Sequence, residues 1–272
     1  MTATKTPNKS IQFVIASSSH GTMIVHRNDQ HFSNNKGYGV GYQILNASSF
    51  DLQEVNFALS ILRQKILLAG EGVVAIDCGA NIGVHTIEWA RFMNSLGEVI
   101  AFEPQEKIYY ALCGNIAINN CFNVSARHAA VGAKSGELAI PELDYFTPSS
   151  FGSLELNKKE KNEFIGQEVN YDQTKFVPLV SIDSLNLKRL DFIKIDVEGM
   201  EEDVLEGAKI SIEKFKPTMI IEVIKSNKIN LEKFLHDRGY EVYPVGINVL
   251  AIHPEDPIHK NLKIENQIIR FI

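Results

Sequence analysis

Four short apolar runs of the sequence each end in a carboxylate. The pairs are Val73–Ile76 with Asp77, Val99–Phe102 with Glu103, Phe192–Ile195 with Asp196, and Met219–Ile221 with Glu222. If the runs are parallel strands of one sheet, these acids meet at its carboxyl edge, where open α/β sheets bind ligands. One acid after a strand often only caps the next helix. Four acids repel one another unless a cationic or polyhydroxylated ligand, or a metal, offsets their charge.

The segment from Asp77 to Thr86 narrows the chemistry, because it joins a predicted strand to a predicted helix. Gly79 permits close backbone approach and Gly83 permits tight packing, as in nucleotide-binding loops. However, the order is G-x-N-x-G, and the acid before the loop would repel a diphosphate. Glu103, after the next strand, suits the two hydroxyls of a ribose. An adenosine ligand with a positive group fits both features, and S-adenosylmethionine is such a ligand.

The elements that must position these acids alternate regularly after Gly72. Strand-like runs lie at Val73–Ile76, Val99–Phe102, Val124–Ala130, Phe192–Ile195, Met219–Val223, Glu241–Val245 and Asn248–Ile252, with helical stretches between most of them. This alternation predicts an α/β fold with a mostly parallel sheet of about seven strands. Gly246 and Ile247 alone separate the last two runs, which therefore form an antiparallel C-terminal hairpin.

The chain is expected to divide into a main domain with flanking segments. Residues 1–50 form an N-terminal extension, with a β-hairpin from Ile11–Ser17 and Thr22–His26 and a glycine-rich loop at 34–41. Within it, Gly37–Tyr42 is either a lid over the site or only a flexible connection. Residues 51–256 form the main domain, which begins with a helix at Leu52–Leu68 that Gly70 ends. Within it, residues 134–190 interrupt the rhythm and are predicted to be a substrate-side insertion with two extra strands. Residues 257–272 are a C-terminal tail.

Several blocks of the sequence resemble FkbM-type methyltransferases. They are Ile76–Gly83, Ala101–Pro104, Ser181–Leu185, Ile193–Glu201 and Val204–Ala208. The resemblance extends from about Leu52 to His253, and the block I-K-I-D-V-E-G-x-E is its most specific part. It implies the Rossmann-like sheet of a class I S-adenosylmethionine-dependent methyltransferase. It also implies methylation of a hydroxyl on a sugar, glycan or secondary metabolite.

The resemblance and the strand-end pattern together assign a cofactor site. Asn81 either contacts the cofactor or caps the following helix, and Thr86 is expected to make a local backbone bond. The segment after the third strand is expected beside the adenine ring. The residues predicted to hold the cofactor are Asp77, Gly79, Ala80, Asn81, Gly83, His85, Thr86, Glu103, Pro104, Ala130 and Val131.

Asp196 and Glu198 are the predicted catalytic residues. Their i, i+2 spacing in an extended segment points both side chains to one side, so either can orient the acceptor hydroxyl or accept its proton. With Glu222 they could also chelate Mg²⁺ or Ca²⁺, although the sequence does not indicate a metal and no metal ligand is assigned. Glu198 could instead cap the next helix. The predicted substrate contacts are Glu222, Tyr42, Ser150 and Phe151.

Composition restricts the partners and the compartment. The net charge of the 272 residues is −6 and no basic stripe occurs, which disfavours nucleic acid. No apolar run reaches the roughly 18 residues of a membrane helix. A polar N-terminus and three cysteines without metal-ligand spacing favour the cytoplasm. The expected partner is a small-molecule or glycan acceptor, and the oligomeric state stays open.

Two other functions are compatible with parts of the pattern. An NAD(P)-dependent oxidoreductase would use the same strand, glycine loop and helix, but Asp77 and the missing third glycine argue against it. A non-catalytic methyltransferase-like protein could use the N-terminal hairpin to bind a partner. Such a protein would not need Gly79 or Asp196, and both are present.

Overall fold

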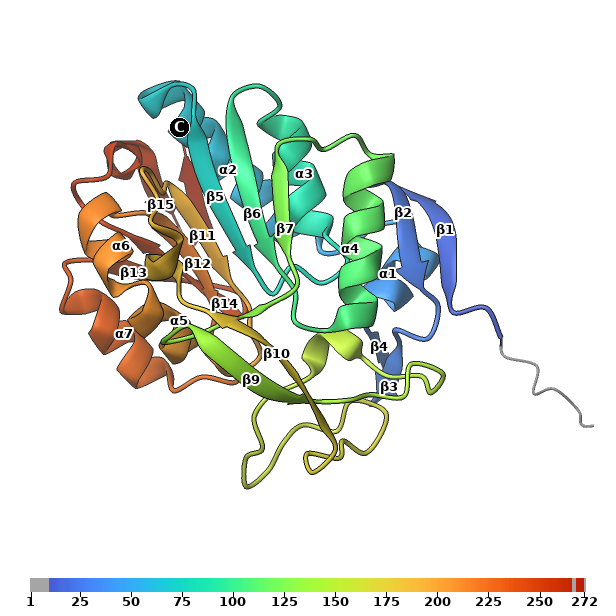
Figure 1. Ribbon diagram of the computed structural model, residues 1–272. Coiled ribbons are helices and arrows are strands. Elements are labelled where there is room, and N and C mark those ends of the chain that lie inside the picture. Colours follow the sequence, from blue (N-terminus) through green and yellow to red (C-terminus); the bar gives the residue numbers. More distant parts are fainter. Residues whose placement is uncertain (1–9, 266–267, 272) are drawn as a thin grey trace, which may run out of the picture.

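A seven-stranded sheet forms the centre of the protein, whose computed structural model describes residues 10–265 and 268–271 (Figure 1). The strand order is β13-β14-β12-β11-β5-β6-β7. β14 pairs antiparallel with both β12 and β13, while the other pairs are parallel. The predicted mostly parallel sheet with an antiparallel hairpin is confirmed. The strands are β5 (Val73–Cys78), β6 (Gly97–Phe102), β7 (Val124–Arg127), β11 (Phe192–Ile195), β12 (Thr218–Glu222), β13 (Glu241–Val245) and β14 (Asn248–Ile252).

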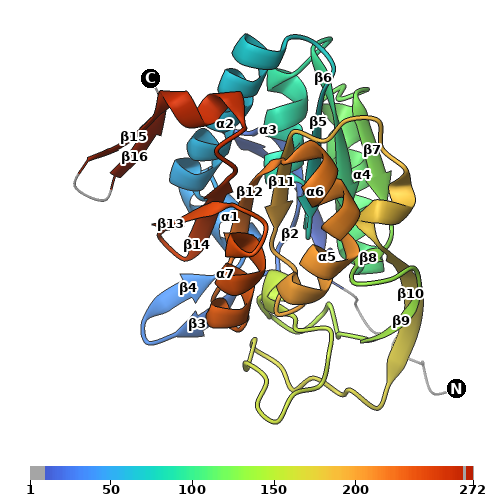
Figure 2. The same ribbon diagram turned by 90° about the vertical axis from the view of Figure 1, so that its left-hand side faces the viewer.

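Helices cover both faces of this sheet, as Figure 2 shows. A hydrophobic core lies on each face of the sheet, and alternate residues of β5 point into one or the other. Val73 and Ala75 belong to the core with α2 and α3, whereas Val74 and Ile76 belong to the core with α5 to α7. Because successive strand residues point to opposite faces, a strand buried on both sides must be apolar throughout. The helices are α2 (Leu52–Ala69), α3 (Val84–Phe92), α4 (Glu106–Ile118), α5 (Glu201–Gly207), α6 (Lys209–Phe215) and α7 (Lys228–His236).

The N-terminal segment begins with the predicted hairpin, β1 (Phe13–Ser18) and β2 (Gly21–His26). β2 packs on α4, where the Asn115 amide donates to the Ile24 carbonyl at 3.1 Å. The predicted loop at 34–41 is partly wrong. It contains the turn of a second hairpin, β3 (His31–Ser33) and β4 (Lys36–Tyr38), and the start of α1 (Val40–Ala47). The segment therefore packs α1 against β2 and β4.

The insertion adds its own sheet beside the central one. β9 (Gly136–Pro141) pairs antiparallel with β10 (Thr174–Val180), which confirms the two extra strands. β10 also pairs parallel with a short strand, β8 (Ala130–Val131). The run Val124–Ala130, predicted as one strand, is divided between β7 and β8. Two short 3-10 helices, η1 (Phe151–Ser153) and η2 (Ile182–Leu185), complete the insertion. Its loops lie beyond the carboxyl ends of the central strands (Figure 1).

The C-terminal segment returns to α2. A 3-10 helix, η3 (Pro257–Asn261), is followed by the hairpin β15 (Leu262–Glu265) and β16 (Ile268–Phe271). A buried ion pair between Lys65 and Asp256 joins α2 to the residue before η3. Residues 1–9, 266–267 and 272 of the predicted extension and tail lie outside the described residues. In the described part of the chain, no helix combines the length and apolar character needed to cross a membrane.

Candidate active site

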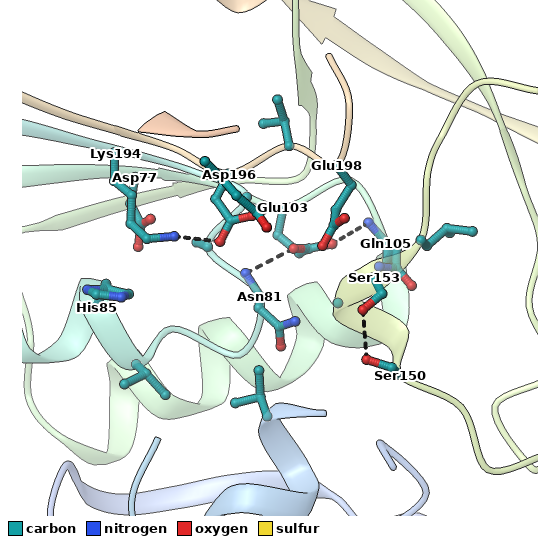
Figure 3. Close-up of a pocket in the computed structure, with 18 of the residues that line it drawn as sticks. Asp77, Asn81, His85, Glu103, Gln105, Ser150, Ser153, Lys194, Asp196 and Glu198 are labelled. Carbon is teal, nitrogen blue, oxygen red and sulfur yellow. Dashed lines mark hydrogen bonds and ion pairs between the residues drawn. The ribbon is translucent and has the colours of Figure 1, made fainter. Parts of the chain in front are cut away.

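A cavity of about 440 Å³ opens at the carboxyl ends of the central strands. The four acids predicted at strand ends all line it: Asp77, Glu103, Asp196 and Glu222. Asp77 lies within β5, Glu222 is the last residue of β12, and the other two directly follow their strands. Figure 3 shows three of these acids and their neighbours around the cavity. The four strand-end acids therefore lie around one cavity, as the functional prediction requires.

Asp77 is buried and its two carboxyl oxygens differ. Oδ2 accepts a hydrogen bond of 2.6 Å from the hydroxyl of Thr86 in the first turn of α3. Oδ1 is buried and has no hydrogen-bond partner among the described residues. Thr86 was expected to bond local backbone, and instead it orients Asp77 without lining the cavity. One oxygen of Asp77 is thus available to a donor on a ligand.

Two glycines of the loop between β5 and α3 permit close contacts. Gly79 has φ of +84°, and a Cβ there would lie 1.8 Å from the carbonyl oxygen of Asp196. Gly83 has φ of +92°, and a Cβ there would lie 2.6 Å from Cδ1 of Leu112 on α4. Gly79 therefore allows the β5 loop to touch the loop after β11. Gly83 serves helix packing and does not line the cavity.

Asn81 and Glu103 form the adjoining wall (Figure 3). The Asn81 N–H donates to Glu103 Oε2 at 3.0 Å, and the Gln105 N–H donates to Oε1 at 2.8 Å. Burial raises the pKa of Glu103 to about 7, although both N–H donors favour its ionised form. The predicted helix-capping role of Asn81 is not found, since Gly83 is the N-cap of α3. Asn81 Oδ1 instead accepts from the Ile82 N–H at 2.7 Å.

The remaining residues predicted to hold a cofactor lie around the same cavity. Ala80, His85, Pro104, Ala130 and Val131 all line it. The His85 ring is buried at the start of α3, and its Nε2 lies 3.1 Å from Glu54 Oε1. Gln105, which sequence reasoning missed, holds the adjoining wall through a 2.8 Å bond from its amide to the Phe151 carbonyl.

A buried lysine connects the catalytic candidates to α2. Lys194 of β11 places Nζ 2.6 Å from Asp196 Oδ2 (Figure 3). The same Nζ lies 3.7 Å from Glu54 Oε1. Asn248 donates to the other oxygen of Glu54 at 2.8 Å. Burial opposes ionisation of Glu54, but Lys194 and His85 outweigh it and lower its pKa to about 2. Carboxylates around Lys194 likewise raise the pKa of that lysine despite burial.

Sequence reasoning missed Glu54. An acid in the first turn of a helix is ordinary, because it interacts favourably with the helix dipole. Glu54 also lies outside every block that resembles a family. The local sequence holds no further signal, since the contact with Lys194 forms only when α2 packs beside the sheet.

Asp196, Glu198 and Glu222 each offer one oxygen, and these oxygens all lie within 4.8 Å of one another. The predicted extended geometry is wrong for Glu198, whose φ is +56° because the chain turns there toward α5. Glu198 does not cap that helix, which has Met200 as N-cap. It pairs with Lys225 at 2.6 Å between Oε2 and Nζ. Since lysines compensate these acids, the cluster does not by itself indicate a metal.

Asp196 and Glu222 bring carboxyl oxygens within 4.8 Å of each other, so the protonation of one affects the other. Burial disfavours the charge on both, but the Lys194 ammonium lowers the pKa of Asp196. The pKa of Glu222 is raised by burial and by its ionised neighbour. Protonation is therefore favoured on Glu222 and disfavoured on Asp196.

The predicted substrate contacts separate into two groups. Ser150 and Glu222 line the cavity, whereas Phe151 and Tyr42 do not. Phe151 is fully buried against His26 and Tyr145, and Tyr42 packs edge-on against Phe32. The insertion instead reaches the cavity through Ser150 and Ser153, whose hydroxyls lie 2.9 Å apart (Figure 3).

Lys225 and Glu163, both missed from the sequence, line the cavity where the insertion meets the end of β12. Lys225 Nζ lies 2.7 Å from Glu163 Oε2 and 2.8 Å from the Ser153 carbonyl oxygen. Glu163 and Ser153 belong to the insertion, and Lys225 follows β12. One ammonium group thereby ties the insertion to the edge of the central sheet.

Asp29 links α1 to the 3-10 helix η1, and residues beside both of these contacts line the cavity. Its Oδ2 accepts from the Gly41 N–H at 2.8 Å, and its Oδ1 accepts from the Phe151 N–H at 3.0 Å. Burial raises the pKa of Asp29 to about 6, although these N–H donors favour the charge. The start of α1 and the start of η1 are thus held by one carboxylate.

The strand order, with one antiparallel strand beside the edge, and the acid-lined cavity at the carboxyl ends define a class I methyltransferase fold. The family model described as methyltransferase FkbM domain matches residues 77–242. The chain belongs to this family of methyltransferases, which sets aside a nicotinamide-dependent oxidoreductase.

Individual relatives of the chain are also named as methyltransferases. The chain is 26% identical over 194 residues to methyltransferase sdnD of Sordaria araneosa, covering 61% of this chain and 73% of the relative. It is 26% identical over 183 residues to methyltransferase 1 of Beauveria bassiana, covering 61% and 72%. A crystal structure of methyltransferase FkbM from Methylobacillus flagellatus matches with 17% identity and a TM-score of 0.48 over 67% of this chain. The match spans 44% of that longer chain.

Proposed function

We propose that this protein is an S-adenosylmethionine-dependent O-methyltransferase that acts on a hydroxyl of a sugar, glycan or secondary metabolite. The observation that carries the proposal is the contact between the loop after β11, which holds Asp196, and the loop between β5 and α3, which holds Gly79. The Asp196 carbonyl lies against Gly79, and the Asp196 carboxylate is held by Lys194 at 2.6 Å. A carboxylate kept ionised beside a cofactor loop can orient a hydroxyl and accept its proton.

The residues around the cavity fit S-adenosylmethionine. Asp77 Oδ1, buried and without a partner among the described residues, suits the ammonium or sulfonium region of this cofactor. Glu103 keeps lone pairs on both oxygens for the ribose hydroxyls. The apolar side chains of Ala130 and Val131 suit the adenine ring. When bound, S-adenosylmethionine supplies a methyl group on a positively charged sulfur.

Asp196 is the proposed catalytic residue. An acceptor hydroxyl in the cavity would donate to its carboxylate, which aligns the oxygen lone pair for in-line displacement at carbon. Because Lys194 lowers the pKa of Asp196, this carboxylate is a weak base and accepts the proton late, as the new O–C bond forms. Glu222, whose raised pKa favours the protonated form, is then suited to donate a hydrogen bond toward Asp196 or the acceptor.

Lys194 and Lys225 supply the positive charge that an acid cluster would otherwise take from a divalent cation. We therefore expect methyl transfer without added metal. An assay with chelator and one with Mg²⁺ should give the same rate, and loss of activity with chelator would assign the three acids a metal role instead.

Two measurements test the proposal. S-adenosylhomocysteine should bind with detectable heat in calorimetry, and label should pass from methyl-labelled S-adenosylmethionine to members of a panel of mono- and oligosaccharides. Asp196→Asn should keep the binding and lose transfer by about two orders of magnitude, the typical contribution of a positioned acid or base. Absence of S-adenosylhomocysteine binding at millimolar concentration would exclude the proposal.

A further inference from the structure

The cavity walls carry many more acidic than basic side chains. Among the described residues that line the cavity are eight carboxyl groups and two lysines. Burial and neighbouring carboxylates together raise the pKa of Glu198 and Glu222, as expected for acids in a negative potential. With the pKa of Glu222 raised, the other seven carboxyl groups still outnumber the two lysines, so a molecule that enters the cavity meets a negative field.

Both lysines already have carboxylate partners. Lys194 lies 2.6 Å from Asp196 and 3.7 Å from Glu54. Lys225 contacts Glu198 at 2.6 Å, Glu163 at 2.7 Å and the Ser153 carbonyl at 2.8 Å. An ammonium group has three N–H donors, so Lys225 has no donor left for a phosphate or carboxylate on a ligand.

The lining on the acceptor side also includes exposed apolar side chains. Tyr38 is 45% exposed, Ile224 59% and Ile247 51%, and all three line the cavity. They come from three separate segments: the end of β4, the residue pair after β12, and the β13–β14 turn. Apolar side chains of this kind suit the C–H faces of an uncharged ring and give nothing to an anion.

We propose that the acceptor is an uncharged molecule, and that the cavity rejects an acceptor with a phosphate or carboxylate near its hydroxyl. The inference rests on the proposed function, since it names the class of molecule that receives the methyl group. It excludes sugar phosphates, nucleotide sugars, uronic acids and RNA as acceptors. One uncompensated like charge across such a cavity should reduce kcat/KM by about 30-fold at an effective dielectric constant near 20.

The first test is a binding experiment that needs no activity. The complex with S-adenosylhomocysteine is titrated with glucose 6-phosphate, UDP-glucose and a short single-stranded RNA. We expect no saturable heat with any of them at millimolar concentration. Saturable binding of any of these anions to the complex with S-adenosylhomocysteine would show that the acceptor site takes anions, and would overturn the inference.

The second test compares matched acceptors in the labelled-methyl assay. A methyl glucoside is paired with its 6-phosphate, and an aryl glucoside with the corresponding glucuronide. We expect at least about 30-fold higher kcat/KM for the neutral member of a pair. Equal rates within a pair, or labelling confined to anionic members, would overturn the inference. If no small molecule is labelled, the proposed function fails, whereas the titrations still decide whether the cavity accepts anions.

Glu163→Gln provides a test within the chain itself. It leaves Lys225 with one carboxylate partner, so the neutral-over-anionic preference should fall several-fold. Glu160→Gln is the matched control, because this exposed acid lies on the same loop and the change in net charge is identical. A preference that is unchanged in Glu163→Gln would overturn the inference, since compensation of Lys225 would then play no part in selection.

Discussion

The carboxylate of Glu54 on α2 lies 3.7 Å from the ammonium of Lys194 on β11, which in turn lies 2.6 Å from the Asp196 carboxylate. The family match begins at residue 77, so Glu54 lies outside it. A residue of the N-terminal part of the chain thereby positions the lysine that holds the proposed catalytic acid. Glu54 also accepts from Asn248 and lies against His85, so its own position is fixed by β14 and α3.

We predict that Glu54→Gln lowers kcat for methyl transfer by about 10- to 100-fold, because a hydrogen bond or ion pair to a charged group contributes about 1.5–3 kcal/mol. Lys194 would then be free to move relative to Asp196. Binding of S-adenosylhomocysteine should stay within about twofold, since Glu54 contacts Lys194, His85 and Asn248 and makes no hydrogen bond or ion pair with Asp77 or Glu103, the acids proposed to hold the cofactor. Steady-state kinetics and calorimetry measure the two quantities.

Two further variants separate positioning from general damage to the Glu54 site. Glu54→Asp keeps the charge and should recover part of kcat. Glu71→Gln makes the same change of charge at an exposed position and should leave kcat unaltered. If Glu54→Gln weakens cofactor binding and kcat equally, the proposed link through Lys194 is incorrect.

The raised pKa of Glu103 predicts that cofactor binding depends on pH. Burial raises its pKa to about 7, and the nearby Asp77 and Asp196 carboxylates add to this shift. Ribose hydroxyls donate to the ionised form, so affinity should rise with pH. Between pH 6 and pH 8 the ionised fraction grows about tenfold, and the Kd of S-adenosylhomocysteine should fall by that factor. Calorimetry at several pH values measures it.

Variants of Glu103 assign this dependence to its carboxyl group. Glu103→Ala should weaken binding by about 1–3 kcal/mol. Glu103→Gln should bind weakly and show a flat profile over the same pH range. A wild-type profile that is flat from pH 6 to pH 8 would move the ribose contact to another residue.

Gly79→Ala should disturb the fold and the site together. The added Cβ would lie 1.8 Å from the backbone oxygen of Asp196, and φ of +84° costs an L-residue about 1–2 kcal/mol in addition. We expect a lower Tm and strongly reduced methyl transfer, because the loop after β11 must move. Gly136→Ala is the control, since a Cβ there meets no atom within 4 Å. Equal thermal stability of both variants would contradict the close contact between Gly79 and the Asp196 backbone.

The sheet and the strand-end acids could be predicted because their signals are local. Apolar runs of strand length marked β5, β6, β11 and β12, and the acids follow directly in the sequence. The left-handed conformation of Glu198 could not be predicted, because it depends on how the chain turns into α5. Contacts such as that between Lys225 and Glu163 depend on the packing of distant segments, which periodicity does not encode.

The start of α1 shows a different limit. Gly39 and Gly41 were interpreted as loop residues, yet Gly41 lies in α1 and Gly39 is its N-cap. A Cβ on either would lie 2.4 Å from a backbone oxygen, that of Asp29 or of His26. These glycines are therefore required by close packing around Asp29. The sequence alone does not distinguish such a glycine from one in a flexible loop.

Asp29→Asn should separate acceptor binding from cofactor binding. The carboxylate accepts N–H bonds from Gly41 and Phe151, and an amide can accept both only with its single oxygen, so one bond is lost. The walls that carry Val40 and Ser150 should loosen, which should raise KM for the acceptor several-fold. The Kd of S-adenosylhomocysteine should not change, and a parallel loss of both affinities would show that Asp29 supports the whole fold instead.

The same variant should alter the pH dependence of stability. Because the pKa of Asp29 is raised from 3.8 to about 6 in the folded protein, protonation of this residue stabilises the fold. That contribution is complete below about pH 4 and is lost as the pH rises through 6, a change of about 3 kcal/mol. The free energy of unfolding of the wild type, measured relative to that of Asp29→Asn, should therefore be larger at pH 4.5 than at pH 7. Urea denaturation at the two pH values measures it, and a constant difference would mean that the Asp29 carboxyl does not titrate in this range.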